Sequence, residues 1–392
     1  MIRLATGWIT LFVMGTDLFV ISPLLPAIAT DFATSAALAG LSVTLFSIVY
    51  MVAAPLLGHV ADRVGRLNTL TACLVVFGAA NALTALAGSF AWLLAARILA
   101  GAAAAGVSPS VYALVGEAAP AGRRATWLGV AVSGLLLSLS IGTPVGTVAG
   151  EAFGWKAVFL GLALASAALA VLNRLLWAGN SFGSRAAAAQ SSARAPGYAA
   201  LARRLVPTIA WATALYSMYT YLGTGLRDGG YSTDQIATTL VAYGAGAIVG
   251  TLAGGRIADW RGVKFATGLG IAGLGAALLA LAAALTSGGP VALLLGLTSA
   301  AAQIFFPSQQ AGLANDFADQ RAAALAWNNS ALFLGISFGS LLGGQAMAQG
   351  GFTADVLMAS GIALFAWLVN AAIVPGRAPP SALGPKAPSS GA

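Results

Sequence analysis

The stretch that decides the fold is Gly58-His59-Val60-Ala61-Asp62-Arg63-Val64-Gly65-Arg66, which lies between two long apolar runs. Its first five residues return in similar form as Gly255-Arg256-Ile257-Ala258-Asp259, at an offset of 255 − 58 = 197 residues. Glycines in such a connection permit a tight turn and a close approach of two helices. A second copy at a fixed distance indicates that one structural unit occurs twice.

Two further places share this offset. Gly142-Thr143-Pro144-Val145-Gly146 matches Gly339-Ser340-Leu341-Leu342-Gly343, and Arg124 matches Arg321. Three separate matches at one offset are hard to produce by chance, so we predict a duplicated unit. Both copies begin and end on the same side of the molecule, which makes the repeat parallel. In membrane proteins with such repeats, a substrate site lies near the bilayer midplane between the halves.

The amino-acid composition predicts a membrane protein. Of its 392 residues 59% are hydrophobic and only 8% are charged, whereas soluble domains carry about 25% charged residues. Runs without charge are long enough for helices of about 20 residues that cross the bilayer. We predict an all-α integral membrane fold of twelve transmembrane helices in two six-helix halves. The expected spans are residues 5–29, 37–57, 69–88, 91–114, 125–150, 157–177, 207–226, 235–254, 266–286, 291–313, 322–348 and 356–374.

The basic residues predict the orientation. Sixteen of the 19 Lys and Arg residues fall on the side that carries both termini, and only Lys156 and Arg227 fall on the other. Because cytoplasmic loops carry the excess of basic residues, we expect a multi-pass inner-membrane protein with both termini in the cytoplasm. The net charge of +8 is then explained by topology, and nucleic acid is not expected as a partner.

The spans divide the chain into four parts. We predict an N-terminal six-helix half over residues 1–178 and a C-terminal half over residues 207–374. Between them, residues 179–206 are rich in Gly, Ser, Ala and Arg and read as a cytoplasmic linker. Residues 375–392 are rich in Pro, Ser, Gly and Ala, a composition typical of a disordered tail.

Two charged residues lie deep inside expected spans. Asp17 interrupts the first apolar segment, where a carboxylate costs about 3 kcal/mol and is by default a candidate ion or proton site. It would bind and release a proton as its access to water alternates. Arg97 lies in the fourth span and needs a partner because its charge persists. The alternatives are a packing hydrogen bond for Asp17, and backbone carbonyl partners or a surface position for Arg97. No other carboxylate is expected deep in a span.

Glycines in the fifth span recur every four residues, at Gly142, Gly146 and Gly150. Such spacing leaves one bare helix face for close packing, and Pro144 is expected to bend the helix. An ordinary small-residue packing seam would have the same pattern.

These features together resemble the major facilitator superfamily over essentially the whole chain. Within it, the closest resemblance is to the twelve-helix drug:proton antiporter group and its sugar and nucleoside efflux permeases. The family loop pattern G-x-x-x-D-R-x-G-R is met by Gly58, Asp62, Arg63, Gly65 and Arg66. The resemblance implies a cytoplasmic gate, in which Asp62 engages the start of span eleven near Arg321–Ala322 and holds the outward-open state. Asp259 repeats Asp62, but Trp260 replaces the arginine, so a weaker gate is expected there.

The resemblance also assigns roles inside the membrane. Arg97-Ile-Leu-Ala-Gly101 is similar to the family pattern R-x-x-Q-G, with Ala100 in place of glutamine. By this resemblance, Arg97 lowers the affinity of a nearby carboxylate for its proton, and we expect Arg97 to be the electrostatic regulator of Asp17 in this way. The fifth span resembles the antiporter signature G-P-x-x-G-G only in part, because Thr143 and Thr147 replace glycines. Asp17 takes the place of a more usual glutamate in the first helix of the efflux branch.

Aromatic and amide side chains in the spans are candidate substrate contacts, because such groups suit an amphipathic or polyol-like ligand. Lipid-facing or packing positions explain each of them equally well. The candidates are Tyr50, Tyr112, Tyr216, Tyr219, Gln303, Phe306, Asn328 and Asn329. The sequence contains a single histidine, His59, and a single cysteine, Cys73. It therefore suggests neither a catalytic set, nor a metal site, nor a cofactor.

We therefore expect a proton-coupled secondary transporter that exports a small molecule, with protons and the lipid bilayer as its other partners. Drugs, sugars, nucleosides and related metabolites all remain open as substrates, and a monomer is implied by the resemblance. The first alternative is a symporter or facilitator that imports a metabolite. A membrane sensor or scaffold without transport is the second, and an integral-membrane enzyme is disfavoured for want of catalytic groups.

Overall fold

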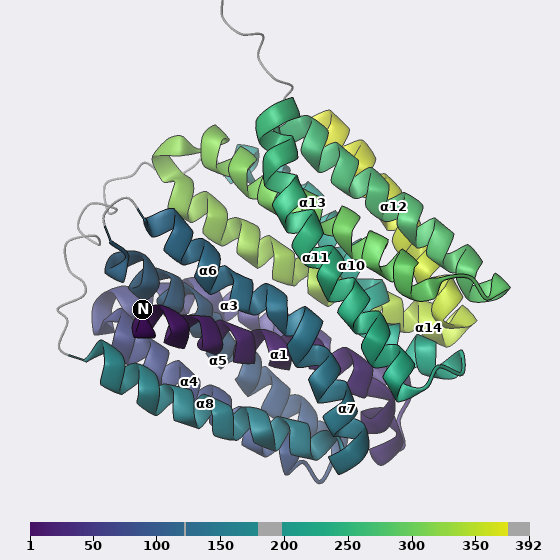
Figure 1. Ribbon diagram of the computed structural model, residues 1–392, viewed down its shortest axis with the longest axis horizontal. Coiled ribbons are helices and arrows are strands. Elements are labelled where there is room, and N and C mark those ends of the chain that lie inside the picture. The colour runs from purple at the N-terminus through teal and green to yellow at the C-terminus, as the bar shows by residue number, and fades with distance from the viewer. Residues whose placement is uncertain (121–122, 179–197, 375–392) are drawn as a thin grey trace, which may run out of the picture.

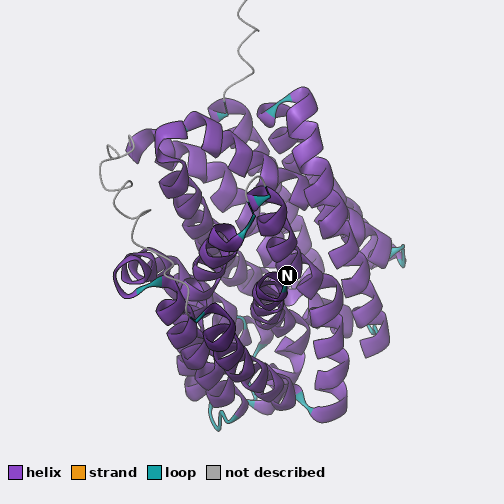
Figure 2. Ribbon diagram, turned by 60° about the vertical axis from the view of Figure 1, so that its left-hand side comes forward, coloured by secondary structure: helices purple, strands orange, loops and turns teal. Residues whose placement is uncertain are grey.

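The computed structural model describes residues 1–120, 123–178 and 198–374. Within these ranges the chain is helical, with short loops and no strand (Figure 2). Residues 179–197 of the expected linker and the expected tail, residues 375–392, lie outside the described residues.

The first six spans are formed by the helices up to residue 177, drawn from purple to teal in Figure 1. The fifth span consists of α6, a five-residue π-helical segment called η1, and α7, which follow one another without a loop. The elements are α1 (Ile2–Asp31), the short α2 (Ala36–Ala39), α3 (Leu41–Val64), α4 (Arg66–Ala85), α5 (Phe90–Ala118), α6 (Arg124–Leu137), η1 (Ser138–Gly142), α7 (Thr143–Phe153) and α8 (Trp155–Trp177).

The other six spans are drawn mainly in green to yellow in Figure 1. The last two spans both belong to α14, although the backbone of α14 is not helical at Gly350 and Gly351. The elements are α10 (Tyr198–Asp228), α11 (Thr233–Arg261), α12 (Val263–Ser287), α13 (Val291–Asp316), the 3-10 turn η2 (Ala318–Gln320) and α14 (Arg321–Ile373).

The expected all-α membrane fold is confirmed. Among the described residues, ten helical segments are long and apolar enough to cross a membrane. One of these is the 51-residue segment Ala323–Ile373, which holds two spans because of the break at Gly350 and Gly351. With the 31-residue α10 added, the helices account for the twelve expected spans.

The repeat seen in the sequence is also a repeat of backbone geometry. Gly65 and Gly262, which are 197 residues apart, have φ of +96° and +89° and separate α3 from α4 and α11 from α12. Gly154 and Gly351 are again 197 residues apart, with φ of +84° and +69°. Residues with a Cβ adopt positive φ only at a cost, so the same glycines end the same helices in both halves.

Two boundaries differ from expectation. Residues 58–64 continue α3 and do not form a loop, because nothing breaks the helix before Gly65. Similarly, α10 begins at Tyr198, inside the expected linker. Leu201 and Leu205 are buried there in one apolar cluster with Leu313 and Ala324, so their burial stabilises the additional helical turns.

We call the end of the bundle where α1 and α10 begin the N face, and the end where these helices finish the far face. Helices α1, α2, α3, η1 and α7 of the first half pack against α10, α11 and α14 of the second. Among the described residues, the hydrogen bonds and ion pairs between the halves lie between the middle of the bundle and the far face.

Candidate functional site

Asp17 and Arg97 form a salt bridge in the first half. Asp17 lies near the middle of α1 and Arg97 in α5, and their exposed fractions are 0% and 1%. Arg97 Nη1 donates to Asp17 Oδ1 and Nη2 donates to Oδ2, each at 3.0 Å. This parallel two-bond geometry is the strongest that a guanidinium and a carboxylate can form.

Aromatic rings surround the guanidinium. Arg97 Cζ lies 4.8 Å from the centre of the Phe46 ring and 5.5 Å from that of Phe159, which adds cation–π attraction. Arg97 Nε has no hydrogen-bond acceptor among the described residues. In the described part of the chain, Asp17 is the one carboxylate that pairs with this guanidinium. Removal of either partner leaves a buried charge at a cost of about 3–5 kcal/mol.

The glycine seam packs against the helix that carries Asp17. A methyl group at Gly142, Gly146 or Gly150 would overlap the side chain of Thr16, Val20 or Leu24 of α1. The π-helical turn η1 directly precedes Pro144, and such turns accommodate a local change in helix direction. The seam thus provides the close packing that its spacing predicts, while its link to antiport stays a prediction.

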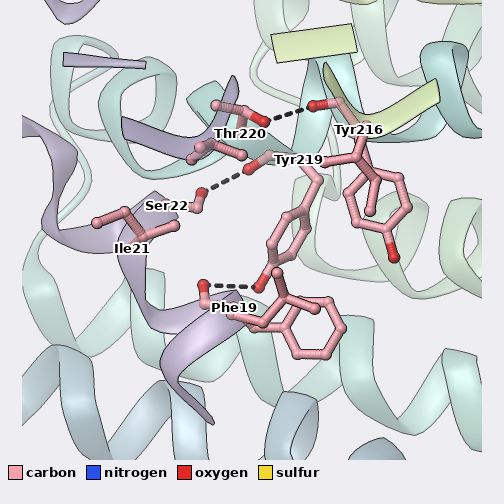
Figure 3. Close-up of a pocket in the computed structure, with 9 residues that line it drawn as sticks. Phe19, Ile21, Ser22, Tyr216, Tyr219 and Thr220 are labelled. Atoms are coloured by element: carbon pink, nitrogen blue, oxygen red, sulfur yellow. Dashed lines mark hydrogen bonds between the residues drawn. The ribbon is translucent and has the colours of Figure 1, made fainter. Parts of the chain in front are cut away.

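The halves meet next to Asp17, at the pocket shown in Figure 3. Ser22 donates to the carbonyl of Tyr219, and the Tyr219 hydroxyl donates to the carbonyl of Phe19 at 3.1 Å. Closer to the far face, Ser340 Oγ donates to the Gly40 carbonyl at 2.8 Å. The pocket is lined by Leu18, Phe19, Ile21, Ser22, Val43, Tyr216, Tyr219, Thr220 and Ile336.

Two groups of predicted substrate residues lie near this interface. Tyr216 and Tyr219 line the pocket of Figure 3. Tyr50 stacks on Phe333 of the other half, with ring centres 3.6 Å apart. Asn329 faces the Tyr50 hydroxyl, and Tyr112 lies nearby. These side chains come from both halves, which is the arrangement that a ligand site between the halves requires.

The remaining substrate candidates lie in the second half. Gln303 and Phe306 are half-buried on α13, and Phe306 stacks on Trp211 with ring centres 5.6 Å apart. Asn328 is fully buried and accepts a hydrogen bond from Thr208 at 2.7 Å. This bond between α10 and α14 explains Asn328 as a packing residue, so the structure does not favour it as a ligand contact.

The residues of the predicted gate lie where α3 meets α4, toward the N face. Asp62 is 48% exposed and pairs with Arg66 at 3.8 Å, and Arg66 also pairs with Glu117 at 3.6 Å. Among the described residues, no hydrogen bond or ion pair joins Asp62 to Arg321, whose Nε donates instead to the Ala314 carbonyl. Gly58 has open space around its Cα, Gly65 provides the turn, and Arg63 and Asp259 are exposed.

The far face carries a polar link between the halves. Arg227 of α10 pairs with Glu151 of α7 at 3.2 Å, and Thr233 of α11 donates to the same carboxylate. By contrast, the pair of Asp31 and Lys156 at 3.0 Å joins α1 to α8 within the first half. The link at Glu151 therefore joins the two halves at the far face.

Sequence reasoning missed a second buried carboxylate. Asp355 has an exposed fraction of 0%, although it lies only four residues after Gly351, at the start of the last span. The expectation that no carboxylate besides Asp17 lies deep in a span therefore stays a prediction. The position of Asp355 in the first turn after the break at Gly351 places it at the positive end of a helix dipole, worth about 0.3–1 kcal/mol. Burial of an ionised group costs several kcal/mol, so the dipole alone does not compensate an ionised Asp355.

The comparisons with known proteins agree with this architecture. A family profile described as the Major Facilitator Superfamily matches residues 7–297 and 208–391. The uncharacterised MFS-type transporter YbcL of Bacillus subtilis (strain 168) is 27% identical over 334 residues, 85% of this chain and 85% of that protein. A chloramphenicol resistance protein of Streptomyces lividans is 30% identical over 259 residues, 63% of this chain and 64% of that protein.

Solved structures show the same fold at low sequence identity. A crystal structure of a D-xylose-proton symporter matches with a TM-score of 0.76 and 18% identity, covering 95% of this chain and 97% of that chain. An inward-open structure of the xylose transporter XylE from E. coli matches with a TM-score of 0.75 and 17% identity, covering 95% and 96%.

Proposed function

The chain belongs to the Major Facilitator Superfamily, and we propose that it exports a small molecule in exchange for protons by alternating access. As a member of that family it is a membrane transporter of small solutes and not an enzyme. The direction of transport, the coupling to protons, the inner-membrane location and a monomeric state belong to the proposal.

The observation that carries the proposal is the buried pair of Asp17 and Arg97. A proton and the Arg97 guanidinium compete for one carboxylate, since both neutralise it in a site that excludes water. When Asp17 takes up a proton, the two hydrogen bonds from Arg97 weaken and α1 is released from α5. The charge state of Asp17 thereby becomes coupled to the packing of helices at the centre of the transporter.

The basic residues support a cytoplasmic N face, and the polar contacts between the halves lie toward the far face. In the proposed cycle, this conformation is the inward-facing one, in which Asp17 is ionised and paired with Arg97. In an exporter, this state accepts substrate from the cytoplasm. The halves, residues 1–178 and 207–374, next rock apart at the far face, substrate leaves, and Asp17 takes up a proton from outside.

The gate residues fit the other half of the cycle. Asp62 is half exposed in this conformation, so it is available to bind the start of α14 when the N face closes. Arg66, at the start of α4, pairs with its carboxylate, and Arg63 follows it at the end of α3. Asp259 takes the corresponding place on α11.

The substrate is proposed to be a drug-like amphipathic compound. The relative from Streptomyces lividans is a chloramphenicol resistance protein, which makes chloramphenicol the first compound to test. Tyr50, Tyr216, Tyr219 and Asn329 between the halves, with Gln303 and Phe306 on α13, provide aromatic faces and amide groups that suit such a ligand.

The test uses the full chain in proteoliposomes with an imposed pH gradient and labelled chloramphenicol. The proposal expects chloramphenicol to move against the proton flow in wild type, and Asp17→Asn to bind it but not to couple its movement to the gradient. Movement in the same direction as protons would identify a symporter. Unchanged coupling in Asp17→Asn would remove Asp17 from the mechanism.

A further inference from the structure

Asp355 is a buried carboxyl group without a counter-charge. Among the described residues, neither of its carboxylate oxygens accepts a hydrogen bond, and no Lys, Arg or His lies within 4.0 Å of them. The Ser217 hydroxyl lies beside it but donates to the Ala214 carbonyl at 3.2 Å. An ionised carboxylate in such a place is unfavourable unless it is paired, so the geometry suits a neutral acid.

The first half shows which residue occupies the position equivalent to Asp355 when that position serves packing alone. Residue 355 − 197 is Val158, and a methyl group at Gly146 would lie 3.6 Å from Val158 Cγ1. In the second half, a methyl group at Gly343 would lie 3.0 Å from Asp355 Oδ1. Equivalent glycines thus face an apolar side chain in one half and a carboxyl group in the other. The fold does not require an acid here.

Asp355 lies beside Tyr221, a side chain of α10 that packs against the first half. A methyl group at Gly343 would contact Tyr221 as well as Asp355, and one at Gly40 would overlap the Tyr221 hydroxyl. Gly40 belongs to the first half, and Tyr221 donates to the carbonyl of Ser340 at 2.8 Å. Tyr221 is the titratable side chain that faces Asp355 from α10. Tyr221 therefore lies between Asp355 and Gly40 of the first half.

We propose that Asp355 is a second proton-binding site, which takes a proton from water at the far face and holds it as a neutral acid while that face is closed. The carboxylate oxygen forms an O–H bond with this proton, and reopening of the far face allows its return to water. Closure of the far face thus consumes one proton at Asp355, independently of Asp17. The inference adds to the proposed function but rests on separate residues.

The experiment is infrared difference spectroscopy of the full-length protein in detergent, titrated over the pH range in which it stays folded. Wild type is expected to show the carbonyl-stretch band of a neutral carboxylic acid, which disappears in Asp355→Asn and persists in Asp17→Asn. Asp31→Asn is the matched control, because Asp31 is an aspartate near the far face that is exposed and paired with Lys156. The control should keep the band.

Three results would overturn the inference. They are a wild-type protein without the band at any pH, a band that survives in Asp355→Asn, and a band that sodium ions remove at constant pH. Asp355→Val, which installs the residue of the first half, is the second variant. The inference requires a neutral side chain to be accepted here, so failure of both variants to fold would also contradict it. Loss of coupling in Asp17→Asn is a separate result that tests the proposed function alone.

Discussion

Asp17 and Asp355 are both fully buried, but they are neutralised in different ways. Asp17 has two hydrogen bonds from Arg97, whereas Asp355 has no cation beside it among the described residues. Their counterparts at the offset of 197 are Ala214 and Val158. Duplication therefore provided a common helical scaffold, and each half places its carboxyl group at a position that is apolar in the other half.

The largest effect is expected when the guanidinium is removed. Arg97→Gln leaves Asp17 buried without a counter-charge and should lower the free energy of unfolding by about 3–5 kcal/mol. Asp355→Asn should change it by much less, since a neutral acid is replaced by a neutral amide of the same shape. Unfolding of the purified proteins in detergent, followed by tryptophan fluorescence at increasing denaturant, measures both.

The double variant Asp17→Asn with Arg97→Gln is the control for this comparison. It removes both charges and should recover most of the stability lost in Arg97→Gln. Equal losses in Arg97→Gln and Asp355→Asn would show that the two carboxyl groups are neutralised in the same way, which would contradict the comparison.

A moderate effect on stability is expected at the two equivalent glycines, Gly343, which faces Asp355, and Gly146, which faces Val158. Gly343→Ala brings a methyl group to 3.0 Å from Asp355 Oδ1 and 3.1 Å from the Ser217 Cα, and overpacking of this kind costs about 1–3 kcal/mol. It should displace Asp355 and shift the pH dependence of its infrared band. Gly146→Ala, at the equivalent position of the first half, should lower stability without any effect on that band. The same change of the infrared band in both variants would show that it comes from a general loss of packing and not from displacement of Asp355.

The fold and the first carboxylate could be predicted from the sequence, because long charge-free runs and an isolated Asp17 are local signals. The pairing of Asp17 with Arg97 was expected only from the family resemblance, since the spacing of 80 residues does not by itself determine which faces of two helices meet. Asp355 was missed for a specific reason. The last span was placed at 356–374 because a charged residue usually marks a loop, while the helix in fact begins earlier, directly after Gly351.

The predicted substrate contacts also show that the sequence does not determine which way a side chain points. Asn328 and Asn329 are adjacent and chemically identical, and the sequence gives no reason to separate them. In the structure Asn328 binds Thr208 within the second half, and Asn329 faces Tyr50 of the first. A helical rotation of about 100° between neighbours decides which amide packs and which is available to a ligand.

A smaller effect is expected at the link between the halves. Glu151→Gln weakens an exposed ion pair with Arg227, and such pairs contribute about 0–1 kcal/mol, so opening of the far face should increase by up to about fivefold. Distances between spin labels on α7 and α11 report that opening. Lys156→Gln, which weakens an ion pair within the first half only, should leave the distances unchanged. A similar opening in both variants would exclude a specific role for Glu151.

The smallest effect on stability is expected at the gate, where the two halves carry the same acid at the same place. Asp62→Asn should change the free energy of unfolding by less than about 0.5 kcal/mol, because Asp62 is 48% exposed and its distance to Arg66 is 3.8 Å.

The effect of Asp62→Asn should appear in transport, since the proposed closed gate needs the carboxylate at the start of α14. Asp259→Asn should slow transport less, because Trp260 replaces the arginine that follows Asp62. Initial rates of chloramphenicol transport in proteoliposomes measure this difference, and equal rates in the two variants would show that the gate, unlike the buried carboxyl groups, is symmetric.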